Sequence, residues 1–367
     1  MATTYDEWVE SQKLPVHKGH LIEDMRTTEL GWWDERKCNA AFVQLVGDED
    51  IAEIRVIEIP PGKSIAPWKF GLDEIYYVLE GRGLATIWGL PGMERKTCEW
   101  QERSLFVAPR QSFRQLSNAR GDKPARLMSY NYLPLAMQAV RDPNFFFNNP
   151  YETAPSAGKE SEDFYSEAKA VWTESEEGRP SGRGNYYTWY GNFFPDMGAW
   201  SKLDPLRNRG AGGHRVYVEV PNSSLSAHMS VFPAQTYKKA HRHGPGRFLV
   251  IPAGEGYSVL WEEGKKKIVV PWHEASAFVP PMHWYHQHFN VGSTPARYLA
   301  LHPPRIFTGG YSTMTDPARQ IEYPDEDPWI RQTFEKELGK RDLTSIMPEE
   351  AYKDRNYEWP YGEPEGD

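Results

Sequence analysis

The stretch His241-Arg-His243-Gly-Pro-Gly-Arg-Phe-Leu-Val-Ile-Pro-Ala-Gly-Glu-Gly256 sets two histidines in front of an apolar run that ends in a Gly-Glu-Gly turn. Side chains alternate along an extended segment, so His241 and His243 project from the same face. A second histidine-rich stretch, Pro281–Asn290, follows downstream and contains His286 and His288. If strands bring the two stretches together, their histidines can bind one metal ion.

The composition narrows the class of protein. The 367 residues suffice for one large domain or two of ordinary size. The net charge of -9 argues against nucleic-acid and anionic-membrane partners. The chain starts without the basic and apolar regions of a signal peptide and has no run of ~20 apolar residues, so we expect a cytoplasmic protein. Cys38 and Cys98 lack the spacing of a thiolate metal site and are expected to be reduced structural thiols.

Short apolar segments separated by Gly and Pro follow one another through most of the chain, which is typical of an all-β sandwich or barrel. The first series comprises 51–58, 74–79, 84–88, 104–108 and 126–132, and a second series comprises 216–220, 249–251, 257–261, 277–280 and 297–301. Landmarks of the two series keep a nearly constant separation: Gly81 with Gly254, Pro109 with Pro281, and Pro124 with Pro295. The chain is therefore predicted to be a tandem duplication of one β-barrel unit.

The duplication suggests four regions. Residues 1–140 form an N-terminal arm and the first barrel, 141–205 a linker region, 206–310 the second barrel, and 311–367 a C-terminal extension. The polar tracts that begin at Ser156 and Glu174 are expected to be mobile. In the extension, Asp327 followed by Pro328 predicts a helix that begins there and runs to about Leu338.

The spacing of these landmarks resembles the two motifs of the cupin superfamily, G-x5-H-x-H-x3-E-x6-G and G-x5-P-x-G-x2-H-x3-N. The first copy matches with Gly62, Trp68, Phe70, Glu74, Gly81, Pro109, Arg114 and Asn118. The second copy matches with His241, His243, Arg247, Gly254, Pro281, His286 and Asn290, while Gln235 and His283 stand where two motif glycines would be. The first copy thus keeps the carboxylate and loses all three imidazoles, and the second copy does the reverse.

Among bicupins the chain resembles the group that includes gentisate-type and salicylate-type ring-cleaving dioxygenases, in which three histidines hold Fe(II). The resemblance implies tandem cupin (double-stranded β-helix, jelly-roll) barrels with a few peripheral helices. It implies metal binding by His241, His243 and His286 in the second barrel and loss of the site in the first. Imidazole nitrogens suit Fe, Zn, Cu, Co or Ni better than Mg or Ca, and Mn is a further alternative to Fe(II).

Without a carboxylate ligand the ion keeps its full charge, which favours an anionic, bidentate substrate. Arg247 stands in the place of the lost acid, where it either holds a substrate carboxylate or turns toward solvent or an acidic neighbour. His288 shares a strand face with His286, so it is a general acid or base beside the metal, a fourth ligand, or a hydrogen-bonded wall. Four aromatic residues are candidates to line the pocket: Phe248, Tyr257, Trp261 and Trp284.

The first copy carries a different expectation. Trp68 and Phe70 fill its former metal site, and Arg114 is expected to close that site by an ion pair with Glu74. Asn290, the last position of the second motif, is expected to be a structural hydrogen bonder.

The leading hypothesis is a non-haem Fe(II) dioxygenase that acts on a chelating, aromatic or enolisable acidic small molecule together with dioxygen. One alternative is a redox-neutral cupin isomerase, lyase or hydrolase with Zn, Mn, Co or Ni. Another is a bicupin that binds a small ligand without catalysis, whose ligand affinity would survive replacement of His241 and His243. Edge strands and terminal segments in bicupins predict a homodimer or a larger homo-oligomer.

Overall fold

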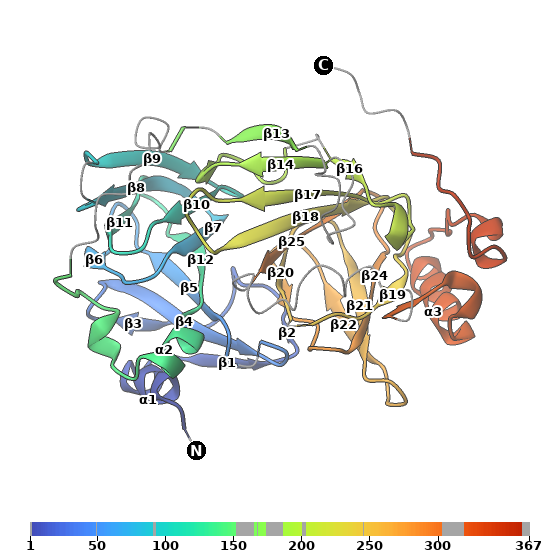
Figure 1. The fold of residues 1–367 in the computed structure, drawn as a ribbon, viewed down its shortest axis with the longest axis horizontal. Coiled ribbons are helices and arrows are strands. Elements are labelled where there is room, and N and C mark those ends of the chain that lie inside the picture. Colours follow the sequence, from blue (N-terminus) through green and yellow to red (C-terminus); the bar gives the residue numbers. More distant parts are fainter. Residues whose placement is uncertain are drawn as a thin grey trace. The chain divides into compact units, whose positions relative to one another are not determined.

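The computed structural model describes residues 2–48, 50–90, 93–151, 165–166, 168–173, 186–199, 203–244, 246–302 and 319–361 (Figure 1). It divides into two compact units whose boundaries interleave along the chain. Unit 1 comprises 1–169, 189–199 and 218–226, and unit 2 comprises 170–188, 200–217 and 227–367. The sheets of each unit are mainly antiparallel, and β1 pairs with β4 in parallel in unit 1.

The first set of sheets is built from the N-terminal half of the chain. Its larger sheet has the strand order β1-β4-β5-β12-β7-β10-β15, with β3 on β4, and its smaller sheet has the order β6-β11-β8-β9. Their strands are β1 Val16–Gly19, β3 Gly31–Trp33, β4 Cys38–Leu45, β5 Glu53–Ile59, β6 Trp68–Lys69, β7 Glu74–Glu80, β8 Arg82–Trp88, β9 Lys96–Gln101, β10 Leu105–Ala108, β11 Phe113–Asn118, β12 Ala125–Asn131 and β15 Phe193–Phe194. The short strand β2 Leu21–Ile22 follows β1 in the chain and belongs to neither of these two sheets.

The second set repeats this arrangement. Its larger sheet runs β13-β14-β17-β18-β25-β20-β23, with β16 on β17, and its smaller sheet runs β22-β21-β24-β19-β26. The strands are β13 Lys169–Thr173, β14 Tyr186–Tyr190, β16 Asp204–Pro205, β17 His214–Glu219, β18 Ser226–Phe232, β19 Ala240–His241, β20 Phe248–Ala253, β21 Gly256–Trp261, β22 Ile268–Trp272, β23 Ala277–Phe278, β24 Tyr285–Asn290, β25 Ala296–His302 and β26 Gln320–Ile321.

The two strand orders match position by position. The path β4-β5-β12-β7-β10 in the first set corresponds to β17-β18-β25-β20-β23 in the second, and β6-β11-β8-β9 corresponds to β19-β24-β21-β22. Gly81 and Gly254 begin equivalent turns with φ of +96° and +93°. An added Cβ would lie 2.8 Å from the Ala125 side chain at Gly81 and 2.7 Å from the Ala296 backbone at Gly254. The prediction of an all-β, tandem-barrel fold is confirmed.

Positive φ angles support the motif alignment at two positions without glycine. Gln235 and His283, which stand where the motif has glycine, have φ of +56° and +63°. A side chain in this region costs roughly 1–2 kcal/mol, which explains why glycine is favoured there. The backbone shape of the motif has therefore survived the loss of its glycines.

Helices cover parts of both units, and they are α1 Thr4–Ser11, α2 Leu133–Ala139, α3 Pro328–Gly339 and the 3-10 turns η1 Pro143–Phe145, η3 Arg207–Arg209, η7 Tyr323–Asp325 and η8 Glu349–Tyr352. The arm expected at the N-terminus contains α1, which starts with a reciprocal capping box between Thr3 and Asp6. Trp8 of α1 stacks on Phe147 with ring centroids 4.9 Å apart, so the helix closes the core of unit 1.

The predicted C-terminal helix is confirmed. Asp327 caps α3, because its side chain accepts a hydrogen bond of 3.0 Å from the Trp329 amide. The buried side of α3 carries Ile330, Phe334 and Leu338, which belong to the same apolar cluster as Tyr257 and Phe289 of the second barrel.

The segment predicted as a linker contributes strands to both barrels. β13 and β14 extend the larger sheet of the second barrel, and β15 pairs with β10 of the first. The Tyr-rich segment Tyr186–Tyr190 is strand β14, whereas Phe145 ends the 3-10 turn η1. The tracts at Ser156 and Glu174 lie outside the described residues.

Two simpler expectations can be checked in the described part of the chain. Cys38 and Cys98 are both buried free thiols, as predicted. None of the described helices is long and apolar enough to cross a membrane.

Candidate metal centre

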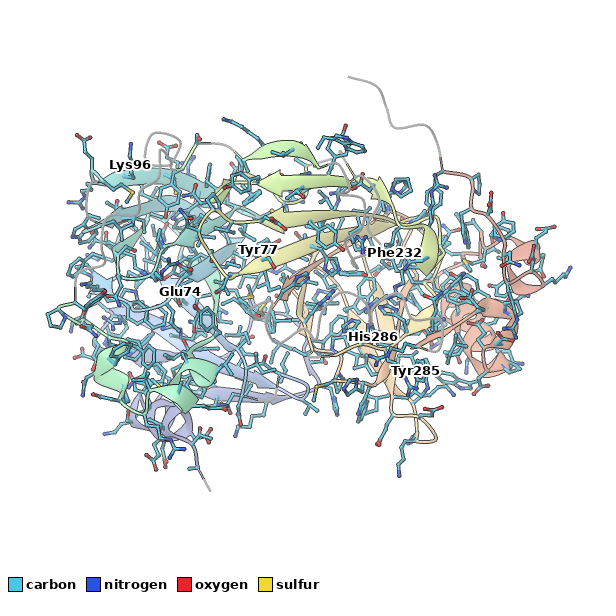
Figure 2. All side chains as sticks on the ribbon, viewed as in Figure 1. Glu74, Tyr77, Lys96, Phe232, Tyr285 and His286 are labelled. Atoms are coloured by element: carbon cyan, nitrogen blue, oxygen red, sulfur yellow. The ribbon has the colours of Figure 1, made fainter. Side chains whose placement is uncertain are left out.

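Two strands and one loop bring three histidines together in the second barrel. His241 on β19 lies directly opposite His286 on β24 in the antiparallel pairing, and His243 follows in the loop after β19. One ring nitrogen of each histidine lies within 4.8 Å of the others. Ring centroids are 4.2 Å apart for His241 and His286, and 4.8 Å apart for His243 and His286. Figure 2 labels His286 within this barrel.

Backbone carbonyls fix the orientation of all three rings. Nδ1 of His243 lies 2.8 Å from the Gly244 carbonyl. Nδ1 of His241 and Nδ1 of His286 lie 3.3 Å from the carbonyls of Lys239 and Trp284. A carbonyl only accepts, so each Nδ1 carries the proton and donates it, which leaves the Nε2 lone pair for a metal ion.

Burial keeps these imidazoles neutral, which is the form that binds metal. Burial, together with the nearby cations Arg209 and Arg247, lowers the pKa of His286 to about 3. Burial is also the main cause that holds the pKa of His241 and His243 well below the ordinary histidine value. The donor set therefore fits a transition-metal ion.

The three histidines form part of the wall of a cavity that is rich in cations. Among the described residues that line it there are three arginines and no Asp or Glu, and the full lining is Leu206, Arg209, Arg215, Tyr217, His228, His241, His243, Arg247, Leu249, Pro280, His286, His288, Tyr298 and Ala300. Arg209 and Arg247 are buried and Arg215 is half-buried. The cavity is therefore suited to an anionic ligand.

The charge of Arg247 acts on the histidines. After burial, Arg247 is the largest cause of the lowered pKa of His243. Arg247 thus lines the cavity beside the candidate metal ligands. This position agrees with the expected orientation in which Arg247 holds a substrate carboxylate.

His288 also lines the cavity, but it is not among the three histidines whose ring nitrogens converge. Its Nδ1 lies 2.8 Å from Ser258 Oγ, and that hydroxyl accepts a hydrogen bond of 3.0 Å from Trp272 Nε1. The Ser258 proton is then available to His288 Nδ1, which would leave Nε2–H of His288 as a donor toward the cavity.

The aromatic residues expected to line the pocket do not line this cavity. Tyr257 packs on Phe289 in the cluster beneath α3, with centroids 4.5 Å apart. Trp261 stacks on Tyr285, and Phe248 precedes the lining residue Leu249 on β20. Alternation along the strands turns these side chains to the opposite face, and the carbonyl of Trp284 lies 3.3 Å from His286 Nδ1.

Sequence reasoning missed the buried amino group of Lys238 next to the cavity, whose pKa burial lowers below the ordinary lysine value. Lys238 Nζ donates to Ser230 Oγ and to Tyr298 OH, the latter at 3.2 Å. Burial raises the pKa of the Tyr298 phenol, but Lys238 and Ser230 outweigh burial, so the pKa lies below the ordinary tyrosine value. Tyr298 is therefore a proton donor or acceptor in the cavity wall. Its partners lie far from it in sequence, so no local motif marks it.

A pair of buried histidines was also missed. His228 Nδ1 and His302 Nε2 lie 2.7 Å apart, and His228 lines the cavity.

The equivalent place in the first barrel is filled, as expected. Arg114 lies opposite Trp68 in the sheet, in the register that pairs His286 with His241 in the second barrel. Trp68 and Phe70 stack with centroids 5.4 Å apart. Arg114 Nη1 lies 3.1 Å from Glu74 Oε2, so the predicted ion pair is confirmed (Glu74 is labelled in Figure 2).

Asn290 holds the backbone, as expected of a structural residue. Its amide donates to the carbonyls of Pro233 and Thr294 at 3.0 and 2.9 Å. Asn118 of the first barrel donates to Pro60 and Lys123 in the same way.

Comparisons with known proteins give distant structural neighbours only. No family model and no curated protein sequence matches the chain. Similar solved structures include oxalate decarboxylase from Bacillus subtilis at pH 4.6, with 11% identity and a TM-score of 0.47 over 78% of this chain and 76% of that one. A formate complex of Lactobacillus farciminis oxalate decarboxylase has 11% identity and a TM-score of 0.49 over 79% and 87%. At these values the likeness carries no implication for the reaction.

Proposed function

We propose that the chain is a metal-dependent enzyme whose second barrel binds a chelating anionic small molecule, and that it is a non-haem Fe(II) dioxygenase. The observation that carries the proposal is the convergence of His241, His243 and His286 at the wall of a cavity without an acidic lining residue among those described. These three neutral ligands would hold a metal ion and would leave it coordination positions for substrate and dioxygen.

The side chains of the cavity have separable tasks. The three imidazoles would hold the ion through Nε2, and the arginines would attract and orient a substrate carboxylate. His288 offers a hydrogen-bond donor, and the apolar wall formed by Leu206, Leu249, Pro280 and Ala300 excludes water. When bound, Fe(II) supplies the redox chemistry that dioxygen activation requires.

The test is anaerobic reconstitution with Fe(II), followed by oxygen uptake with a panel of phenolic, enolic and thiol acids. We expect oxygen consumption with at least one class of acid, and none from zinc-loaded protein or from the His286→Ala variant. Iron-loaded protein that consumes no oxygen with any member of the panel would contradict the dioxygenase assignment.

One observation favours a redox-neutral alternative. The Tyr298 phenol beside Lys238 faces the same cavity, and proton transfer at a substrate bound to a metal is the chemistry of an isomerase, lyase or hydrolase. This alternative predicts turnover without oxygen in zinc- or manganese-loaded protein and its loss in Tyr298→Phe. The same panel under argon, followed by product analysis, separates the two reactions.

A further inference from the structure

A second cavity lies in the second barrel, between its smaller sheet and the start of α3. Its volume is about 430 Å³, and residues of β19, β21, β24 and β26 line it together with Lys267, residues 325–328 and Ile330. Among the described residues, none lines both this second cavity and the metal-centre cavity. A water molecule takes up roughly 30 Å³ of the liquid, so the second cavity is large enough for a small organic molecule.

The two cavities lie on opposite faces of the same two strands. On β24, His286 and His288 line the metal-centre cavity, and Gln287 between them lines the second cavity. On β19, Ala240 lines the second cavity and its neighbour His241 lines the metal-centre cavity. Adjacent residues of a strand point to opposite faces of the sheet. The second cavity therefore lies on the face of the smaller sheet that is turned away from the histidines.

Gln287 gives the second cavity a hydrogen-bond acceptor. The side chain is fully buried, and its Oε1 has no hydrogen-bond partner among the described residues. Its Nε2 donates a hydrogen bond of 3.2 Å to Glu326 Oε2. An ionised carboxylate only accepts, so this bond fixes which end of the amide is the oxygen. A buried acceptor left unpaired costs about 1–3 kcal/mol, so the second cavity suits a ligand that donates a hydrogen bond.

Two of the three carboxylates that line the second cavity are paired with cations of the protein. Asp327 Oδ2 lies 2.6 Å from Lys267 Nζ, and Asp325 Oδ1 lies 2.5 Å from Arg355 Nη2. The third lining carboxylate is that of Glu326.

The Glu326 carboxylate accepts hydrogen bonds from two neutral side chains. Tyr237 OH donates to Oε1, and Gln287 Nε2 donates to Oε2. A carboxylate has about four lone-pair sites, so that of Glu326 can accept further hydrogen bonds. An ammonium group offers three donors, which suits the neighbouring acceptors of Glu326 and Gln287.

We propose that the second cavity binds a small organic cation whose ammonium group donates hydrogen bonds to the Glu326 carboxylate and to Gln287 Oε1. The apolar body of the ligand would lie against Trp261, Ile321 and Ile330, which line the same cavity. This site goes beyond the proposed metal centre and does not depend on it, because the two lie on opposite faces of the sheet.

The test is calorimetry at pH 8 with a panel of small primary ammonium ions, each compared with the alcohol of the same carbon skeleton, such as 2-phenylethylammonium and 2-phenylethanol. The pKa of Glu326 is about 7, so its carboxylate is mainly ionised at this pH. We expect at least one ammonium ion to bind with one-to-one stoichiometry and at least about tenfold more tightly than its alcohol, the gain from one charge-assisted hydrogen bond.

Substitutions locate the binding. Glu326→Gln should remove the preference for the ammonium ion, and Gln287→Leu should weaken its binding. Glu263→Gln, at an exposed acid outside the lining, is the matched control and should retain the affinity of the parent protein. His243→Ala, on the metal-centre cavity, should also retain it.

Three results would overturn the proposal. The first is that no ammonium ion of the panel binds more tightly than its alcohol. The second is an unchanged affinity for the ammonium ion in Glu326→Gln or Gln287→Leu. The third is loss of binding in His243→Ala, which would place the ammonium ion at the metal-centre cavity.

Discussion

One position distinguishes the two barrels at the level of single residues. Glu74 and Arg247 occupy equivalent places in the repeat, and the first is buried with two arginines while the second faces a cavity beside three histidines. Burial raises the pKa of Glu74, but Arg55 and Arg114 outweigh it and hold the pKa below the ordinary value. The two barrels therefore differ in the sign of the charge at this position and in the presence of the histidines. The first barrel has a filled site, and the second has a cavity.

The metal ligands give the first prediction. Replacement of His286 by Ala removes one of three ligands, and we expect zinc affinity to fall by at least about 100-fold, as measured by competition with a coloured chelator. His273→Gln, at an exposed histidine on the same barrel, should leave affinity unchanged. Equal affinities for the two variants would show that His286 is not a ligand.

The closed site of the first barrel gives the second prediction. Glu74→Gln leaves the buried Arg114 without its anion and leaves Arg55 with Glu53 alone, so we expect a loss of about 3–5 kcal/mol in the free energy of unfolding in denaturant titration. Glu80→Gln, at the exposed end of the same strand, should change stability by less than about 0.5 kcal/mol. A small effect of Glu74→Gln would mean that the ion pairs of Glu74 with Arg55 and Arg114 contribute little to stability.

The converging histidines could be predicted from the sequence, because Gly and Pro residues fixed the alignment with the two motifs independently of the histidines. It did not reveal Arg209, Arg215, Lys238 or Tyr298, which reach the cavity from elements far apart in the chain. It also misplaced the pocket aromatics, because high aromatic content supplies candidates on both faces of every strand.

Two glycines in turns between strands differ in the space around them. Gly254 has φ of +93° and an added Cβ would lie 2.7 Å from Ala296 Cα, whereas Gly264 has φ of +76° and open space around it. Gly264→Ala should therefore lower the free energy of unfolding by about 1 kcal/mol, which is the cost of a positive φ for alanine. Gly254→Ala should lower it clearly more, because the added Cβ also collides with Ala296. Thermal unfolding of the two variants side by side is the measurement, and equal losses would contradict the steric argument.

The connection that leads into α3 provides a pH-dependent element. Burial raises the pKa of Glu326 to about 7, although Tyr237 and Gln287 donate hydrogen bonds to its carboxylate. Because the pKa is raised on folding, this contribution to stability is complete below the unfolded value near 4.5 and is lost as the pH rises through 7.

Glu326→Gln should therefore flatten the pH dependence of stability between pH 5 and 8. The expected gain over the parent protein at pH 8 is about 1–2 kcal/mol in the free energy of unfolding. The free energy of unfolding of both proteins is measured by urea titration across this pH range. An identical pH dependence in the two proteins would contradict the raised pKa of Glu326.

Elements with a local signal were predictable from the sequence, and those that depend on packing were not. Asp327 and Pro328 predicted the start of α3, because the side-chain cap and the fixed φ of proline both act within the first turn of the helix. Helix α1 is short and was not recognised despite its capping box. Strands β13 and β14 carry strand-favouring Val, Trp, Tyr and Thr residues, but they lie within a long region of polar composition that was read as a linker.

The whole molecule contains two barrels of matching strand order, one with a filled central site and one with three converging histidines. We expect the barrels to be further combined in a homodimer or larger assembly, because bicupin-like edge strands and terminal segments favour pairing between copies. Light scattering after size exclusion should give at least twice the chain mass of 42.3 kDa. A single species at the chain mass would contradict this expectation.

The central claim is that the second barrel holds one metal ion through three histidines while the first holds none. Elemental analysis of the purified protein, with and without the His241→Ala and His286→Ala substitutions, tests it most directly. We expect close to one transition-metal ion per chain, with iron as the metal, and its loss from both variants. A protein that contains no metal after reconstitution, or variants that retain it, would contradict the account.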